Sequence, residues 1–381
     1  MRRVLVFWVY CLGACGPGSR AGVDGGDPCV GDETRCVDLT YQVCTGGSFT
    51  DEEFCAGACI VGHGCAKCQP EKGNACSNNN VVVCNPDGTF GAEVEMCRSD
   101  ETCLDGECRG GCTTEGIELI YLVDEQKRFL SFDPRLLPGD PFRLLGILGC
   151  PVTKPSLQMP PGLVGPFSMS VDRKGKAWVE YSSGEIFNVS IENAACTATG
   201  YVPAASGMNL FGMGFVSDEA NESVEKLYIA GGGRSAEPSG RLAVVDVGAA
   251  DYTPQIIGSY AAQSDFSPEL TGTSDGKLYG FFPVISSGPA FIQEIDTGTG
   301  MPFGPRWDLG TTGLGGAIRS WAFAQWGGKF YVFVAVNTGG IGVSSTVRSI
   351  DKATGTYTIE LDSIPYNIPG AGVSTCAPIV N

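Results

Sequence analysis

Four copies of a short motif recur at nearly equal intervals in the later part of this 381-residue chain. Each copy has Gly or Glu, then Lys, any residue and an aromatic residue. The lysines are Lys176, Lys226, Lys277 and Lys329, separated by 50, 51 and 52 residues. Short alternating β-type segments surround every copy. Repeated units of this length with several short strands each predict the blades of a β-propeller.

A second recurrent element fixes the number of units. An apolar segment that ends in an acidic turn follows each motif, as in "VVDVG", "EIDTGTG" and "SIDKATG", and "SFDP" follows "IELIYLVD" at the start of the region. We therefore predict five blades over residues 117–381, with six as the alternative. Because Asp246, Asp296 and Asp351 recur at equivalent positions, we expect them to cap turns rather than to form a unique site.

The two ends of this region predict how the propeller closes. The first unit begins at "IELIYLV", which corresponds to the second strand of a blade, and the chain finishes in an unpaired strand-like segment. A last strand that completes the first blade removes exposed sheet edges. We expect Gly372 to Val380 to form this innermost strand.

Twelve cysteines upstream of the propeller form two units of similar spacing, residues 29–67 and 68–112. Units of about 40 residues bury too little apolar surface to be stable alone, so we expect three disulfides in each. Six cysteines allow 15 pairings, and the sequence does not choose among them. The candidates are Cys29, Cys36, Cys44, Cys55, Cys59 and Cys65, then Cys68, Cys76, Cys84, Cys97, Cys103 and Cys108.

Four further cysteines allow two more bridges. We favour Cys150 with Cys196, linking neighbouring blades, and Cys112 with Cys376, linking the domain entry to the closing strand. The predicted fold class is thus all-β, with a small disulfide-rich repeat region followed by a five-bladed propeller closed by the carboxy-terminal strand.

Composition limits the compartment and the partners. Eighteen cysteines against one histidine, His63, indicate an oxidising compartment. Cys65 and Cys68 have a zinc-type spacing, but no second such pair follows and exported thiols oxidise, so we expect neither a metal nor a cofactor. The net charge is −17 without a Lys/Arg cluster, which argues against a nucleic-acid partner.

The amino terminus predicts export. Arg2 and Arg3 precede an apolar run of eleven residues, which is too short to span a bilayer. Its end, "LGAC", resembles the bacterial lipobox, which implies that residues 1–15 are a lipoprotein signal ending in a lipidated Cys15; cleavage without lipidation is the alternative. The resemblance implies a membrane anchor and an outer-membrane lipoprotein, periplasmic or surface-exposed. Residues 16–28 predict a flexible tether.

Several longer segments carry a family resemblance. "MSVDRKGKAWVEYSSGEIF", "ELTGTSDGKLYGFF" and "GAGVSTCAP" resemble exported myxobacterial β-propeller proteins, many of them lipoproteins, and "NNNVVVCNPDGTFG" resembles their cysteine-rich repeats. The resemblance covers most of the mature chain. It implies no activity, and therefore no functional residues.

No catalytic motif stands out. His63 lies in "IVGHGCAKC", which is typical of a turn, and "GGGRSAEPSG", residues 231–240, is typical of a loop. Glu180 and Glu185 flank a predicted hairpin turn, with Asp172 upstream, and five-bladed propellers can cleave glycans with paired acids. Because side chains alternate between the two faces of a strand, Glu180 can face outward as readily as inward. We therefore favour structural roles for these acids.

Aromatic residues offer a second indication of glycan binding. Trp178, Trp321 and Trp326, with Phe323 nearby, could stack on sugars, but blade cores require large aromatics, so we expect core packing. We therefore expect a non-catalytic, lipid-anchored cell-envelope protein, not an enzyme, whose propeller binds an envelope protein or a glycan. The alternative is a carboxylate-dependent glycan hydrolase or lyase.

Overall fold

The structure is a computed structural model of the chain. It describes residues 28–37, 39–55, 58–78, 80–97, 101–104, 106–110, 112, 114–158, 163–218, 221–231, 240–248, 252–260, 267–283, 289–309, 317–337 and 343–380. The predicted signal, Cys15, nearly all of the tether and residues 232–239 of the glycine-rich segment lie outside this set. Two compact units result. One holds the described residues up to Gly73 with Cys84–Phe90, and the other holds Asn74–Val83 with the described residues from Gly91 onward.

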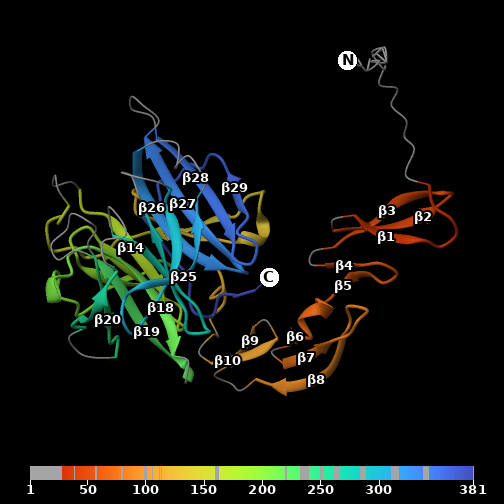
Figure 1. Cartoon of the computed structure of the whole chain (residues 1–381), viewed down its shortest axis with the longest axis horizontal. Helices are drawn as coiled ribbons and strands as arrows, with labels where there is room; N and C mark the ends of the chain where they lie inside the picture. Colours follow the sequence, from red (N-terminus) through yellow and green to blue (C-terminus); the bar gives the residue numbers. More distant parts are fainter. Residues whose placement is uncertain are drawn as a thin grey trace, which may run out of the picture. The chain divides into compact units, whose positions relative to one another are not determined.

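The cysteine-rich part is made of short antiparallel strands (Figure 1). Its first repeat contains β1 (Thr34–Val37), β2 (Thr40–Thr45) and β3 (Ser48–Phe54) in one sheet, and the hairpin β4 (Ala58–Ile60) and β5 (Gly64–Ala66). Its second repeat contains a 3-10 turn at Pro70–Lys72, the sheet β6 (Asn74–Ser77), β7 (Asn80–Cys84) and β8 (Phe90–Met96), and the hairpin β9 (Glu101–Leu104) and β10 (Glu107–Gly110).

Both repeats are crosslinked in the same order. In each, the first cysteine bonds the third, the second bonds the fifth, and the fourth bonds the sixth. The pairs are Cys29–Cys44, Cys36–Cys59 and Cys55–Cys65, then Cys68–Cys84, Cys76–Cys103 and Cys97–Cys108. Two further bonds, Cys112–Cys376 and Cys150–Cys196, are the pairs that the sequence favours. Disulfides in this number place the chain in an oxidising compartment outside the cytoplasm.

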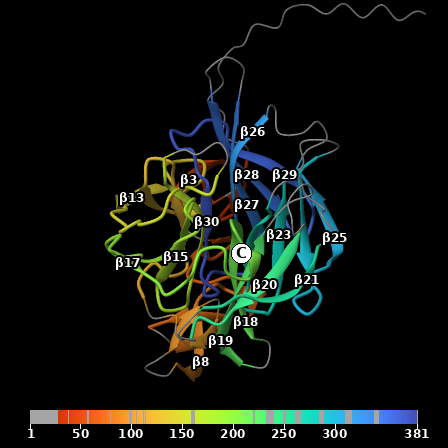
Figure 2. The ribbon, with the colours of Figure 1, turned by 90° about the vertical axis from the view of Figure 1, so that its left-hand side faces the viewer.

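Five four-stranded antiparallel sheets form the propeller and surround a common centre in Figure 2. Blade one has β11 (Ile120–Val123), β12 (Arg128–Phe132), β13 (Phe142–Ile147) and β30 (Gly370–Gly372); blade two has β14 (Pro166–Val171), β15 (Lys176–Tyr181), β16 (Ile186–Ser190) and β17 (Cys196–Ala198). Blade three has β18 (Phe211–Asp218), β19 (Asn221–Gly231), β20 (Arg241–Val245) and β21 (Gln255–Ser259); blade four has β22 (Glu269–Gly272), β23 (Leu278–Phe282), β24 (Phe291–Ile295) and β25 (Pro302–Asp308). Blade five has β26 (Ala317–Trp326), β27 (Lys329–Asn337), β28 (Val343–Asp351) and β29 (Tyr357–Leu361). The all-β class and the five blades are as predicted.

The carboxy-terminal strand closes blade one, but at a position different from the one predicted. β30 pairs with β11 over three residues, with Gly370 opposite Val123 and Gly372 opposite Tyr121. The strand therefore ends where the predicted segment, residues 372–380, begins. Beyond it the chain turns, with the Ala377 amide donating to the Ser374 carbonyl. This turn contains Cys376, which forms its disulfide with Cys112 there.

The repeated motifs have local structural roles. The motif lysine belongs to the second strand of its blade or directly precedes it: Lys176 begins β15, Lys329 begins β27, Lys277 precedes β23, and Lys226 lies within the longer β19. The recurrent aspartates cap turns as expected, since Asp296 accepts from the amides of two following residues, at 2.7 and 3.0 Å, and Asp351 does the same. Among the described residues, no helix has the length and apolar character to cross a membrane.

Candidate functional site

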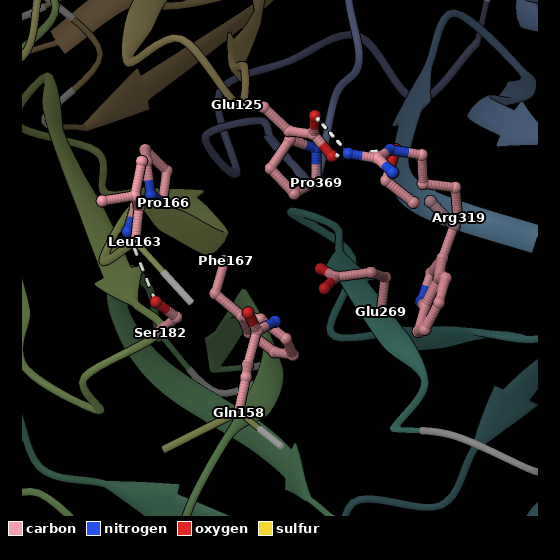
Figure 3. A pocket seen from close by; sticks show the side chains of 12 residues that line it. Glu125, Gln158, Leu163, Pro166, Phe167, Ser182, Glu269, Arg319 and Pro369 are labelled. Atoms are coloured by element: carbon pink, nitrogen blue, oxygen red, sulfur yellow. Dashed lines mark hydrogen bonds and ion pairs between the residues drawn. The ribbon is translucent and has the colours of Figure 1, made fainter. Parts of the chain in front are cut away.

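A pocket of about 430 Å³ opens where the innermost strands of the propeller begin (Figure 3). Four of the five blades or their loops contribute to its wall. The lining residues are Glu125, Gln158, Leu163, Gly165, Pro166, Phe167, Ser182, Glu269, Arg319, Ser320, Trp321 and Pro369. The size suits a small ligand, and the mixture of apolar and polar groups is typical of a binding site.

Glu269, the first residue of β22, supplies a buried carboxyl group to this pocket. Only 3% of the residue is exposed, and its side chain points into the space between the labelled groups of Figure 3. The Ser168 hydroxyl donates to Oε2 at 2.8 Å. Burial raises the pKa of Glu269 well above its usual range, and the Ser168 hydrogen bond opposes this only in part. Glu269 therefore holds its proton at a pH at which an ordinary glutamate has lost it.

A second carboxyl group of the pocket is paired with a cation. Glu125 forms a two-pronged ion pair with Arg319, whose Nε and Nη2 lie 3.2 and 3.1 Å from its oxygens. Asn367 donates to the same carboxylate at 3.3 Å, and Ser345 fixes the Asn367 amide from the other side at 2.7 Å. This arrangement orients an ionised carboxylate at the pocket rim.

The three acids that the sequence singles out, Glu180, Glu185 and Asp172, lie in different surroundings. Glu180 is completely buried in β15; its Oε2 accepts from the Phe211 amide at 3.1 Å, and its Oε1 has no partner among the described residues. Burial raises the pKa of Glu180, and the neighbouring charge of Glu269 adds to this. Glu180 thus faces the interior and does not line the pocket.

The other two acids are structural. Glu185 accepts from the Thr153 amide and hydroxyl, at 3.0 and 2.6 Å, and from the Lys154 amide at 3.1 Å, so it fixes the loop that follows blade one. Asp172 caps the β14–β15 turn and accepts from the Trp178 indole at 3.1 Å. Both carboxylates are thus engaged in hydrogen bonds that hold loops and turns in place.

One of the four aromatic residues reaches the pocket. Trp178, Phe323 and Trp326 are buried in the cores between blades, and the Trp326 indole donates to the Glu118 carbonyl at 2.7 Å. Trp321 is half-buried and lines the pocket, where its ring offers a flat apolar surface. Core packing is therefore confirmed for the other three. Trp321, in the middle of β26, packs against the core between blades four and five and also lines the pocket.

The remaining candidates carry no chemistry. The His63 amide donates to the Ile60 carbonyl within a turn of the first repeat. Cys65 and Cys68 are consumed in disulfides and cannot ligate zinc as thiolates. In the described part of the chain, no group of three or more His, Cys, Asp or Glu side chains is placed to hold a metal ion.

Sequence reasoning missed Ser168 and Glu269, which share one position in the repeat. Ser168 and Glu269 each lie eight residues before the motif lysine of their own blade, and each pairs with the residue four positions after that lysine, Glu180 and Phe281. The repeat therefore places a hydroxyl and a carboxyl group at equivalent points of blades two and four, where they form a hydrogen bond. An acid at this position was not a distinctive signal, because Asp218 also lies eight residues before its motif lysine, Lys226.

No protein-family model matches the sequence, and no curated protein matches it. Solved structures with some likeness include a GH43 enzyme of Bacteroides ovatus, "Xyloglucan PUL GH43B" (17% identity, TM-score 0.37, 53% of this chain and 40% of that one). An α-L-arabinofuranosidase of Clostridium thermocellum follows (12%, TM-score 0.38, 53% and 73%), as does the hydrazine synthase of Kuenenia stuttgartiensis (14%, TM-score 0.32, 61% and 59%). The chain thus spans 59% and 40% of the first two structures in this comparison.

Two predictions are corrected here. The expectation of a non-catalytic binding protein, and with it the expectation that the chain is not an enzyme, is contradicted by structural neighbours that are glycoside hydrolases. The physical reason in this chain is Glu269. Side chains alternate between the two faces of a strand, so the sequence did not show which way an acid points, whereas the fold places Glu269 in the wall of a pocket.

Proposed function

We propose that the propeller is a glycoside hydrolase in which Glu269 is the proton donor. One observation carries the proposal: a buried carboxyl group lines a pocket that also holds a second carboxyl group ion-paired with Arg319. Glycoside hydrolysis requires two such carboxyl groups, one acid and one base, in environments that separate their roles. Burial supplies the first environment, and the Arg319 ion pair supplies the second.

The chemistry follows from the two charge states. Glu269 would give its proton to the oxygen of the glycosidic bond as that bond breaks. Glu125 would accept a proton from the water that attacks the anomeric carbon, while Arg319 and Asn367 hold the carboxylate in place. The Trp321 ring would pack against the apolar face of a sugar, and the Gln158 side chain would offer hydrogen bonds to hydroxyl groups.

The test compares two amide substitutions. Glu269→Gln keeps the shape and the hydrogen bond from Ser168 but cannot give up a proton, so we expect a loss of about 100-fold or more in kcat on pentose and hexose oligosaccharides. Glu192→Gln, on an exposed turn of blade two, serves as the matched control and should retain full activity. Unchanged hydrolysis by Glu269→Gln would refute the assignment.

We also propose that the enzyme is anchored to the outer membrane through a lipid on Cys15, where envelope glycans would be its substrates. The lipobox-like "LGAC" after an apolar run supports this, as does the oxidising compartment that the disulfides require. Several acyl chains on one residue anchor a protein firmly. Cys15→Ser should move the protein from the membrane fraction to the soluble fraction, and an unchanged distribution would refute the anchor.

A further inference from the structure

The hydrogen bond between Ser168 and Glu269 crosses the centre of the propeller. Ser168 lies on the innermost strand of blade two, β14, and Glu269 on that of blade four, β22. The innermost strand of blade three, β18, lies between them and contacts both. Two side chains in blades that are not neighbours therefore meet only because little side-chain volume intervenes.

Gly212 of β18 provides this space. A Cβ atom at Gly212 would lie 2.0 Å from the Pro268 carbonyl oxygen and 2.6 Å from the Glu269 Cα. Both are backbone atoms at the very start of β22, so any larger residue would push that segment away. The φ angle of Gly212 is not in the left-handed region, so close approach, and not backbone freedom, is what requires glycine here.

We propose that Ser168 and Gly212 are positioning residues for the reaction of Glu269: Gly212 sets where β22 begins, and the Ser168 hydroxyl fixes the carboxyl group and tunes when it releases its proton. This inference rests on the proposed function, because it assigns roles around the same carboxyl group. Neither residue would touch the reacting atoms. Among the described residues, Ser168 is the hydrogen-bond partner of the Glu269 side chain.

The dry surroundings make this one hydrogen bond decisive. Ser168 is completely buried, so removing its hydroxyl group leaves the Glu269 carboxyl without a donor on that side. The charged groups that face Glu269 are the buried Glu180 and, at the pocket rim, the pair of Glu125 and Arg319. The rim pair is neutral overall and Glu180 disfavours a second charge, so none of these groups would stabilise an ionised Glu269 in place of Ser168.

The first test removes and restores the hydroxyl. A hydrogen bond to the ionised form lowers the pKa, so Ser168→Ala should raise the pKa of Glu269 and move the alkaline limb of the kcat/KM pH profile upward by about one to two units. Ser168→Thr restores a hydroxyl and should leave the limb near its original position. The pKa is also read without substrate from the infrared carboxyl band that disappears in Glu269→Gln.

The second test uses two glycines with equal clashes. Gly272 lies at the other end of β22, and a Cβ there would lie 2.0 Å from the Phe215 carbonyl oxygen, as close as that of Gly212 to Pro268. Both Ala substitutions should lower thermal stability. Only Gly212→Ala should shift the infrared titration of Glu269 and reduce kcat, by about 100-fold for a displacement near 1 Å.

The outcomes separate the two proposals. A titration that moves in Ser168→Ala and Gly212→Ala, in a protein that hydrolyses no glycan, would refute the proposed function but support the positioning roles. An active enzyme whose Glu269 band is unmoved by Ser168→Ala, or moved equally by Gly212→Ala and Gly272→Ala, would overturn the positioning roles. If Gly212→Ala does not fold, the Ser168 variants alone decide.

Discussion

The cysteine-rich repeats and the propeller blades are both units of some 40 to 50 residues, but they are stabilised by opposite means. The repeats leave large apolar side chains in solvent, with Phe54 at 72% and Met96 at 67% exposure, and carry three disulfides each. The blades bury side chains such as Phe132, Phe281 and Phe333 completely against neighbouring blades. A unit that packs on neighbours gains apolar burial, whereas a unit without such a face depends on crosslinks.

The largest expected effect is in blade one, a packed unit that is also closed by a disulfide. β30 contributes only three residues, and the Cys112–Cys376 bond joins positions 264 residues apart. Replacing both cysteines with serine should lower the free energy of unfolding by about 5 kcal/mol, because such a long loop gains much entropy on release. Urea denaturation measures this loss. A change below about 1 kcal/mol would show that strand pairing alone closes the propeller.

The apolar side of the comparison is tested by a matched pair of truncations. Phe281→Ala removes a fully buried ring between blades four and five and should cost about 3 to 5 kcal/mol. Phe54→Ala removes the same atoms from an exposed position in the first repeat and should stay within about 0.5 kcal/mol. Equal losses in denaturation experiments would contradict the division between packed and crosslinked units.

The covalent side is tested in the first repeat. The Cys36–Cys59 bond spans 23 residues, so replacing both with serine should remove about 3 kcal/mol, which is comparable to the entire stability of so small a unit. Hydrogen exchange should show that β1, β2 and β4 lose protection while the blades keep theirs. If these strands keep their protection, the first repeat is stabilised by packing and not by this disulfide.

The smallest expected effect concerns the junction of the second repeat with the propeller. Glu225 accepts from the Arg173 amide at 2.8 Å and from the Thr375 hydroxyl at 3.1 Å, and the Arg173 guanidinium donates to the Gly110 carbonyl at 2.8 Å. Burial raises the pKa of Glu225 to about 7, and the charge of Asp172 adds to this.

Because the folded state binds the Glu225 proton more tightly than the unfolded state, this contribution to stability is complete below pH 4.5 and is lost as pH rises through about 7. The loss should be at most about 3 kcal/mol. Melting temperatures measured between pH 4 and 8 should fall with pH, and Glu225→Gln should flatten the slope. An equal slope in the variant would place the titration elsewhere.

Much of the fold follows from the repeat itself. The nearly equal spacing of the motif lysines predicts four blades because each lysine lies in, or directly before, the second strand of its blade, and "IELIYLVD" supplies the second strand of the first blade. The closing strand was expected a few residues too late, since Val373 and Thr375 have β-type side chains although the chain turns there. Disulfide order within the cysteine repeats required coordinates, because spacing alone does not show which strands lie together.

The site was less accessible to sequence reasoning. Glu180 drew attention through its hairpin, yet it faces the interior, whereas Glu269 sits at the start of a strand that reads as an ordinary blade segment. Its partner Ser168 is about 100 residues away in the chain and two blades away in space. Such a contact depends on the closure of the ring and on the small size of Gly212, neither of which a local pattern reveals.

The position of β30 has a consequence for biosynthesis. The ribosome makes β11, β12 and β13 well before it makes the strand that completes their sheet, and Cys112 waits for a partner near the end of the chain. Until then the β11 edge stays open to other chains. Any product truncated before residue 370 would keep blades two to five complete and leave the β11 edge unpaired, so we expect it to associate with other chains.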